Sequence, residues 1–360
     1  MPKEKSGSAL KSKTFYSVLL KYQKKINSQF NFFFNEKIKE SFLISQEAVK
    51  TIKILKDYAL GEGKRLRPIL IIIGYLLAGG KNKKEILKTS LSVELIHNFF
   101  LIHDDIIDED KLRRGQPSLH YFYQKKFGDN HHTGISLAMV GGDITNALGY
   151  EILIKSRFLE KHKIKAIKIL NETVEKTCHG EMGELLLKKR EFSERDILKI
   201  YEHKTAYYTF VNPLKIGAVL AGQSEKFLDK LEKFALPMGI AFQIQDDILG
   251  LFGSQKEIGK PIGSDIKENQ PNLLIFKTLA LADYKNKRKF RKYLGQSKTT
   301  KKDINKIREI VKESGALKYS REKSENLIKK AKYSLEEMEM PGKEKHFLLD
   351  LSDYIIIRNY

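Results

Sequence analysis

The stretch ELIHNFFLIHDDIIDEDKLRRGQPS occupies residues 94–118 and is the most informative part of the chain. Between residues 95 and 102 only two side chains are polar, a pattern that predicts a buried helix. Asp104 and Asp108 follow and are four residues apart, so on a helix both carboxylates point the same way. His97 lies seven residues before Asp104 and falls on the same face. The helix is therefore expected to end in a cluster of ionisable side chains.

Three carboxylates at the end of an apolar helix repel one another unless a cation lies between them. The three are Asp104, Asp105 and Asp108. Oxygen ligands of this kind suit Mg²⁺. Arg113 and Arg114 follow, and paired arginines beside a magnesium site are suited to bind a diphosphate. Taken alone, the same pattern also fits a helix that ends in a charged surface loop.

A second acidic cluster argues against the surface-loop alternative. In GIAFQIQDDILGLFG (239–253) another apolar helix runs into adjacent aspartates, Asp246 and Asp247. Gln243 precedes Asp246 by three residues and shares its face, whereas the third acidic position is occupied by Gly250. Two acidic helix ends that face one cavity could each bind metal ions on the same substrate phosphates.

Basic side chains lie in three further segments. GEGKRLRPIL (61–70) places Lys64, Arg65 and Arg67 just before an apolar helix, whose exposed amides would add to an anion site. Pro68 fits the first turn of that helix. The remaining candidates are Lys204 and Thr205 in HKTAYYTF (203–210) and Lys260 in KEIGKPIGSDIKENQ (256–270). Each segment alone is equally well explained as a solvated basic turn or surface lysine.

The composition excludes several classes of protein. The chain has 360 residues and one cysteine, which excludes a disulfide framework and a thiolate zinc site. An apolar content of 41% is too high for a disordered protein. The longest apolar run, 68–80, is shorter than the ~20 residues of a membrane helix, and residues 1–13 lack the apolar centre of a secretory signal. We expect a soluble cytoplasmic protein without a transmembrane segment.

The net charge of +21 is concentrated in the flanks. Residues 1–56 carry 12 basic and 4 acidic side chains, and residues 283–345 carry 20 and 10. Residues 57–282 are close to balance, with 33 basic and 29 acidic. A basic excess of this size is compatible with binding to RNA or to an acidic membrane surface. A solvated, lysine-rich exterior explains it more simply, and we expect no nucleic-acid partner.

Helical periodicity extends over almost the whole chain, because apolar residues recur at spacings of three and four. The sequence therefore predicts an all-α fold of ten or more helices. Glycines at 79–80, 141–142 and 259–263 are expected to interrupt helices. We expect one domain over residues 14–360, preceded by a disordered basic N-terminus over residues 1–13.

Six segments together resemble the trans-isoprenyl diphosphate synthase, or polyprenyl synthetase, family. They occur in the family's order within residues 61–275, and they are GKRLRP (63–68), ELIHNFFLIHDDIIDEDKLRRG (94–115), GGDIT (141–145), KTAYYT (204–209), FQIQDDILGLFG (242–253) and IGKPIGSDI (258–266). The resemblance implies an isoprenoid-synthase bundle around a deep central cavity, usually a homodimer. It also implies a prenyltransferase that joins isopentenyl diphosphate head-to-tail to an allylic diphosphate, with about three Mg²⁺ ions, or Mn²⁺, per active site.

The resemblance also assigns roles to the matching positions. The ligands of isopentenyl diphosphate would be Lys64, Arg67, His97 and Arg114. The residues in contact with the allylic diphosphate would be Arg113, Lys204, Thr205, Gln243 and Lys260. The magnesium ligands would be Asp104, Asp108 and Asp246, with Asp105 and Asp247 as further candidates.

Three positions depart from the family pattern. Gly250 leaves the second acidic motif without its last carboxylate, a feature that some members share. Gln270 stands where the family has a late lysine, which removes one expected phosphate contact. Gly180-Glu181 and Glu184 replace a frequent Gly-Gln and acidic residue, and we assign no role to these two glutamates.

The length of the product is expected to depend on the side chains below the first aspartates. Phe99 and Phe100 lie five and four residues before Asp104. Paired aromatics there resemble farnesyl diphosphate synthases, in which the rings form the floor of the pocket. We therefore expect a C15 product, with C20 as the alternative, although both rings would also fit an ordinary core.

Three other functions are compatible with part of the pattern. A terpene cyclase would share the fold and the first acidic motif, but it would have no second diphosphate for Lys64, Arg67 and His97 to bind. A non-catalytic protein that binds RNA or an acidic membrane would explain only the basic flanks. A regulatory subunit of a synthase pair is disfavoured by the intact first motif and by Lys204.

Overall fold

The computed structural model describes residues 4–188, 191–253, 262–296, 299–340 and 342–357, with side chains from residue 15 onward. The backbone divides into two compact units. The first unit consists of Met1–Asn171 and Pro213–Ser224, and the second of Glu172–Asn212 and Glu225–Tyr360. The sequence-based prediction of one domain over 14–360 with a disordered segment over 1–13 stays a prediction, although helix α1 is described from Glu4.

The described residues are predominantly helical, as predicted. The elements of the first unit are α1 (Glu4–Ser41), α2 (Gln46–Leu60), α3 (Leu66–Leu77), α4 (Lys83–Thr89), α5 (Leu91–Ile107), β1 (Leu112–Arg113), β2 (Gln116–Pro117), α6 (Leu119–Lys126) and α7 (His131–Ile154). Helix α8 (Glu160–Leu187) leads into the second unit, and α10 (Asn212–Leu220) brings the chain back to the first.

The second unit is also built from helices. Its elements are α9 (Glu194–Ile200), the π-helix η1 (Tyr201–Val211), α11 (Glu225–Phe252), α13 (Ser264–Lys267), α14 (Leu273–Leu281), α15 (Tyr284–Arg291), α16 (Lys301–Glu313), α17 (Ala316–Glu336) and α18 (Gly342–Ile357). The all-α prediction of ten or more helices is confirmed. Over the part of the chain that the structure describes, none of these helices combines the length and apolar composition needed to cross a membrane.

Two glycines of α7 allow neighbouring helices of the first unit to pack closely, Gly142 against α5 and Gly141 against α6. A Cβ atom on Gly142 would lie 2.5 Å from Nε2 of His103, and a Cβ atom on Gly141 would lie 3.1 Å from Cδ2 of Leu119. Both glycines lie inside α7, so the prediction that they interrupt a helix is wrong. The two positions lack side chains to make room for a neighbouring helix rather than to form a turn. Gly79, with φ of 83°, does follow the end of α3 as predicted.

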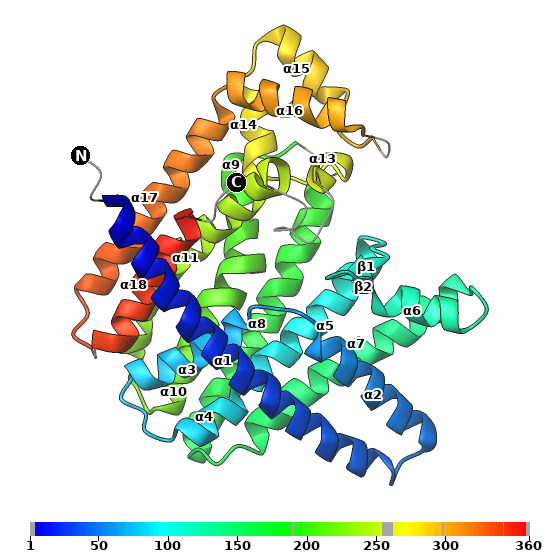
Figure 1. Ribbon diagram of the computed structural model, residues 1–360, viewed down its shortest axis with the longest axis vertical. Coiled ribbons are helices and arrows are strands. Elements are labelled where there is room, and N and C mark those ends of the chain that lie inside the picture. Colours follow the sequence, from blue (N-terminus) through cyan, green and yellow to red (C-terminus); the bar gives the residue numbers. More distant parts are fainter. Residues whose placement is uncertain (1–3, 189–190, 254–261, 297–298, 341, 358–360) are drawn as a thin grey trace. The chain divides into compact units, whose positions relative to one another are not determined.

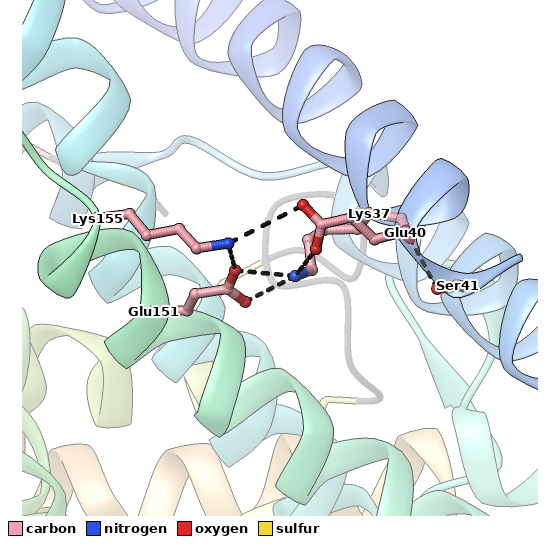
Figure 2. Close-up of polar contacts among 5 residues, drawn as sticks. All are labelled: Lys37, Glu40, Ser41, Glu151 and Lys155. Carbon is pink, nitrogen blue, oxygen red and sulfur yellow. Dashed lines mark hydrogen bonds and ion pairs between the residues drawn. The ribbon is translucent and has the colours of Figure 1, made fainter. Parts of the chain in front are cut away.

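A network of charged side chains joins helices α1 and α7 in the first unit (Figure 2). Nζ of Lys37 lies 2.8 Å from Oε2 of Glu151 and 2.5 Å from Oε2 of Glu40. Lys155 is paired with Glu151 on the same helix. The network borders a cavity of about 290 Å³ whose lining carries charges of both signs. Figure 1 shows α2 running back beside the C-terminal half of α1.

The second unit contains a π-helix between two α-helical segments. Helix η1 packs against α11, and a Cβ atom on Gly239 of α11 would lie 2.5 Å from Cα of Ala206 in η1. Gly180 of α8 approaches η1 equally closely, because its Cβ atom would lie 2.8 Å from the backbone nitrogen of Lys204. π-helical turns occur frequently at functional sites. Here the turn places three helices at van der Waals distance around Lys204 and Thr205.

Candidate active site

The first acidic motif lies at the C-terminal end of α5, as predicted. The helix ends at Ile107, and the backbone nitrogen of Asp108 donates to the carbonyl oxygen of Asp104 at 2.8 Å. The side chains of Asp104 and Asp108 are partly exposed, whereas Asp105 is completely buried. The three aspartates therefore divide into two that can reach a ligand and one that is enclosed by protein.

Asp105 is occupied by contacts within the protein. Nε of Arg113 donates to Oδ1 of Asp105 at 2.6 Å, and the hydroxyl of Tyr58 donates to Oδ2 at 3.1 Å. Burial raises the pKa of Asp105 above its ordinary value, an effect that Arg113 opposes. Both Asp105 and Arg113 were candidate ligands of substrate or metal. In this structure they bind each other, and sequence reasoning had no signal for Tyr58, which comes from α2.

A tight turn positions the two arginines. Strands β1 and β2 pair antiparallel, with Arg113 opposite Gln116. The two residues of the turn, Arg114 and Gly115, have φ of 53° and 76°. Positive φ at both central positions is the geometry of the two-residue hairpin turn that suits twisted strands. The two arginines have different partners, because Arg113 contacts Asp105 and Arg114 lies beside His97.

Arg114 lies in a cluster of basic groups within the first unit. Its Nη2 is 3.5 Å from Nε2 of His97, and a Cβ atom on Gly63 would lie 3.1 Å from its Nη1. Burial, followed by the charges of Arg67 and Arg114, lowers the pKa of His97 well below its usual value. The loop that precedes α3, the α5 helix and the β-hairpin thus place Arg67, His97 and Arg114 near one another, three of the four residues that we expect to bind isopentenyl diphosphate.

Arg65 and Lys64 are neighbours with opposite environments. Arg65 is 2% exposed and donates to Glu94 at 2.9 Å, to Asn27 at 2.9 Å and to the carbonyl of Gly61 at 2.8 Å. Its φ of 54° turns the chain into α3. Lys64 is exposed. Of the basic residues in the 61–70 segment, Arg65 therefore holds the loop in place, while Lys64 is exposed and Arg67 is half-buried.

The two phenylalanines of α5 are buried and in contact. Phe99 and Phe100 are 7% and 6% exposed, and their ring centroids are 4.9 Å apart. The ring of His103, one turn later, lies 4.6 Å from that of Phe99. His103 is in turn held against α7, 3.4 Å from the carbonyl oxygen of Met139. Phe99 is thus buried between neighbouring rings about one helical turn before the acidic residues, where we expect the floor of the substrate pocket.

In the second unit a chain of hydrogen bonds connects η1 to α11. Thr205 donates to Gln243 at 2.6 Å, and Gln243 donates to Asp247 at 2.9 Å. Asp247 also accepts from the hydroxyl of Tyr201, which itself accepts from the backbone nitrogen of Leu273 at 2.7 Å. Burial and the charge of Asp265 raise the pKa of Asp247 well above its usual value. The structure therefore places Asp247 inside the protein as a partner of Tyr201 and Gln243.

Lys204 lies between two glutamates of α8. Its Nζ is 2.5 Å from Oε2 of Glu181 and 3.0 Å from Oε2 of Glu184. Both carboxylates are largely shielded, with 15% and 14% of their side chains exposed, and burial raises the pKa of Glu184. Glu181 and Glu184, to which we assign no role from the sequence, thus orient the lysine that we expect to contact the allylic diphosphate.

An acidic side chain from another part of the chain, Asp265, lies beside the second acidic motif. Asp246 is partly exposed on α11. A Cβ atom on Gly250 would lie 3.4 Å from Oδ2 of Asp265, which also accepts from Asn272 at 3.1 Å. The carboxylate of Asp265 therefore lies close to position 250, where the motif has no acidic side chain. Lys260, the remaining candidate, lies outside the described residues.

Gln270 is close to Asp265, but its side chain binds Glu268. Its side chain donates to Oε2 of Glu268 at 2.9 Å, and its backbone nitrogen donates to the carbonyl oxygen of Asp265 at 2.8 Å. The residue that replaces the family's late lysine is thus engaged in a local turn.

The donor set suits magnesium bound together with a phosphate. No group of three or more His, Cys, Asp or Glu side chains arranged to hold a metal occurs among the described residues. Mg²⁺ is commonly held by one or two carboxylates, with water and substrate phosphates as the remaining ligands. The partly exposed pair of Asp104 and Asp108 on one helix face fits that requirement, and Asp105 and Asp247 do not, because each is buried and hydrogen-bonded within the protein.

Comparison with known proteins gives a consistent result. Residues 49–311 match the family model described as polyprenyl synthetase. The chain is 31% identical over 337 residues to a geranylgeranyl diphosphate synthase of Sulfolobus acidocaldarius. This alignment covers 90% of this chain and 98% of the relative. It is 33% identical over 260 residues to a short chain isoprenyl diphosphate synthase of Methanocaldococcus jannaschii. That alignment covers 72% of this chain and 75% of the relative.

A solved structure resembles the fold over nearly its full length. It is a geranylgeranyl pyrophosphate synthase from Corynebacterium glutamicum, complexed with isoprenyl diphosphate and magnesium. The TM-score is 0.88 at 27% sequence identity, and the match covers 94% of this chain and 99% of the other.

Proposed function

Because this chain belongs to the polyprenyl synthetase family and is a prenyltransferase of the short-chain type, we propose that it condenses isopentenyl diphosphate with an allylic diphosphate to give the C20 product, geranylgeranyl diphosphate. The resemblance seen in the six sequence segments is confirmed at the level of the family. The substrates, the metal and the length of the product are the parts that we propose.

One observation carries the proposal of two diphosphate substrates. Along α5, His97 lies within a group of arginines, whereas Asp104 and Asp108 lie about two turns further on. A diphosphate can bind directly to the cations of the first group, but it needs Mg²⁺ to bind beside carboxylates. The same helix therefore offers two different anion sites, as a reaction between two diphosphates requires.

The protein side chains would each perform a definite task. Lys64, Arg67, His97 and Arg114 would bind isopentenyl diphosphate and orient its double bond. Lys204, held by Glu181 and Glu184, would neutralise charge on the departing diphosphate. When bound by Asp104, Asp108 and Asp246, Mg²⁺ would supply the remaining charge neutralisation. Thr205 and Gln243, with their hydroxyl and carbonyl oxygens, would lie beside the allylic cation.

The proposal of a C20 product replaces the C15 expectation. Relatives named geranylgeranyl diphosphate synthase include proteins from Sulfolobus acidocaldarius and Saccharolobus solfataricus, which share 31% and 32% identity with this chain. The paired phenylalanines had suggested a shorter product. In the structure Phe99 is held by ring contacts with both Phe100 and His103, and we propose that the pocket above this ring has space for one more isoprene unit than a C15 product needs.

A direct assay tests the proposal. Purified protein is mixed with Mg²⁺, isopentenyl diphosphate and allylic starters of C5, C10 and C15, and the products are sized by chromatography after dephosphorylation. We expect geranylgeraniol from every starter, and no consumption of the allylic substrate when isopentenyl diphosphate is omitted. Consumption without isopentenyl diphosphate would point to a cyclase instead. A farnesol end point would overturn the assigned length but leave the reaction intact.

We further propose that the protein functions as a homodimer. On α7 the side chains of Leu137, Val140 and Ile154 are 37%, 57% and 56% exposed, and their spacing places them on one side of the helix. A second copy that packs on this face would cover them. Light scattering of the wild type and of Val140→Glu tests this: the wild type should have twice the mass of one chain, and the variant should shift toward the monomer.

A further inference from the structure

Helix α15 presents an unusual concentration of positive charge. Five of its residues are Lys or Arg and none is acidic. Phe290 is completely buried in the apolar cluster of the second unit, which fixes the rotation of the helix. The opposite side therefore faces solvent, and its exposed cations are Lys285, Arg288, Lys289, Arg291 and the following Lys292.

Three other basic residues of the same unit provide a contrast to these cations, because each of them is paired with an acidic side chain. Lys277 and Lys323 are paired with Glu194 at 2.7 and 3.0 Å, and Lys332 is paired with Asp353. Within the described part of the chain, no cation of α15 forms an ion pair with a carboxylate. Cations left without partners on a rigid helix retain their attraction for an external polyanion.

Helix α16 extends the basic face. The amide of Asn286 near the start of α15 donates to Glu313 at the end of α16 at 3.3 Å. The two helices pack against each other (Figure 1), so this contact sets them antiparallel. The end of α15, with Arg291 and Lys292, is therefore directed toward the start of α16, where Lys301 and Lys302 are exposed.

We propose that the α15–α16 hairpin is a docking face for the anionic surface of a lipid bilayer. Each exposed Lys or Arg near such a surface adds to the attraction. Tyr284 and Leu281, which are 83% and 51% exposed at one end of the face, are side chains suited to the headgroup region. The choice of a bilayer over nucleic acid rests on the proposed function, because a C20 diphosphate is an amphiphile that partitions into membranes.

Vesicle sedimentation tests the proposal. Full-length protein is mixed with vesicles of phosphatidylcholine alone, or with about a third of phosphatidylserine, at low and at physiological salt. The wild type should bind only the anionic vesicles, and less at the higher salt. Replacing Lys285, Arg288, Lys289 and Arg291 by Gln should weaken binding at least about tenfold and leave product formation from dissolved substrates unchanged.

A variant with the same loss of charge elsewhere serves as the control. Lys230, Lys318, Lys329 and Lys330 are also exposed in the second unit, and their replacement by Gln should change vesicle binding by less than about threefold.

Equal weakening by both variants, or no binding of the wild type to anionic vesicles, would overturn the docking face. Tighter binding to RNA than to anionic vesicles, lost in the α15 variant, would reassign the face to nucleic acid. A protein that docks but forms no prenyl product would contradict the proposed function alone.

Discussion

Asp105 and Arg113 form a buried ion pair, with Nε of the arginine 2.6 Å from Oδ1 of the aspartate. The pair lies between two aspartates that remain partly exposed, Asp104 and Asp108. One acidic motif therefore serves two purposes. Its outer members are the ones that we propose to bind ligand, and its middle member is paired with Arg113 of the β-hairpin.

This division predicts different effects for two isosteric substitutions. Asp104→Asn should lower kcat by about 100-fold or more with little change in melting temperature, because it removes a metal ligand at the surface. Asp105→Asn should cost about 2–3 kcal/mol of folding free energy, because it leaves the Arg113 charge buried without its partner. Thermal denaturation and Mg²⁺ titrations of activity distinguish the two. An Asp105→Asn protein of normal stability whose Mg²⁺ requirement rises steeply would instead make Asp105 a metal ligand.

Adjacent basic residues, Lys64 and Arg65, should also respond differently. Lys64→Ala should raise KM for isopentenyl diphosphate roughly 10-fold or more, since it removes one exposed charged contact to the substrate. Its melting temperature should be that of the wild type. Arg65→Ala should cost about 3–5 kcal/mol, because Glu94 would lose its buried partner. Steady-state kinetics and urea unfolding check both. A stable Arg65→Ala protein with a raised KM would place Arg65 in the substrate site.

The sequence was sufficient for the helical fold and for the family. Periodicity located α5, and the spacing of Asp104 and Asp108 gave the orientation of their carboxylates. It was insufficient wherever a residue's role depends on its neighbours in space. Arg65 has the same charge as Lys64, and only burial beside Glu94 separates their functions. The Gly141–Gly142 pair could not be distinguished from a turn until a helix was found against it.

The same limitation applies to contacts across long sequence separations. Tyr58 and Tyr201 hold Asp105 and Asp247 through hydrogen bonds that span 47 and 46 residues. Tyrosines in apolar helices are ordinary core residues by pattern, so no feature of the sequence selects these two. The proximity of Asp265 to Gly250 is similarly impossible to read from the sequence, because the two positions are separated along the chain and meet only in the fold.

The contact between Phe99 and His103 leads to a prediction about the length of the product. Phe99→Ala should shift the main product from C20 to C25 or longer, because it removes the ring below the aspartates. Phe347→Ala is a matched control, since Phe347 is 6% exposed, close to the 7% of Phe99, but lies in α18 of the second unit. Both changes should cost about 3–5 kcal/mol, so product sizes are compared at a temperature where both proteins are folded. An unchanged product length in Phe99→Ala would place the floor elsewhere.

Glu194 predicts how stability depends on pH. It begins α9 and accepts hydrogen bonds from Lys277 of α14 and from Lys323 and Tyr319 of α17. Partial burial opposes its ionisation, but these hydrogen bonds outweigh burial and lower the pKa of Glu194 to about 2. A depressed carboxylate pKa stabilises the fold at pH values above the unfolded pKa of 4.5, and this contribution is lost as the pH falls toward 2.

The wild type should therefore exceed Glu194→Gln in unfolding free energy by about 1 kcal/mol at pH 7, after allowance for solvent screening. The difference should shrink between pH 4.5 and 2, because the wild-type carboxylate then becomes as neutral as the amide. Urea unfolding of both proteins at pH 7, 4 and 3 measures it. Glu325→Gln in α17, at an exposed position, is the control and should match the wild type at each pH. A difference that stays constant over this range would mean that Glu194 acts through packing rather than through its charge.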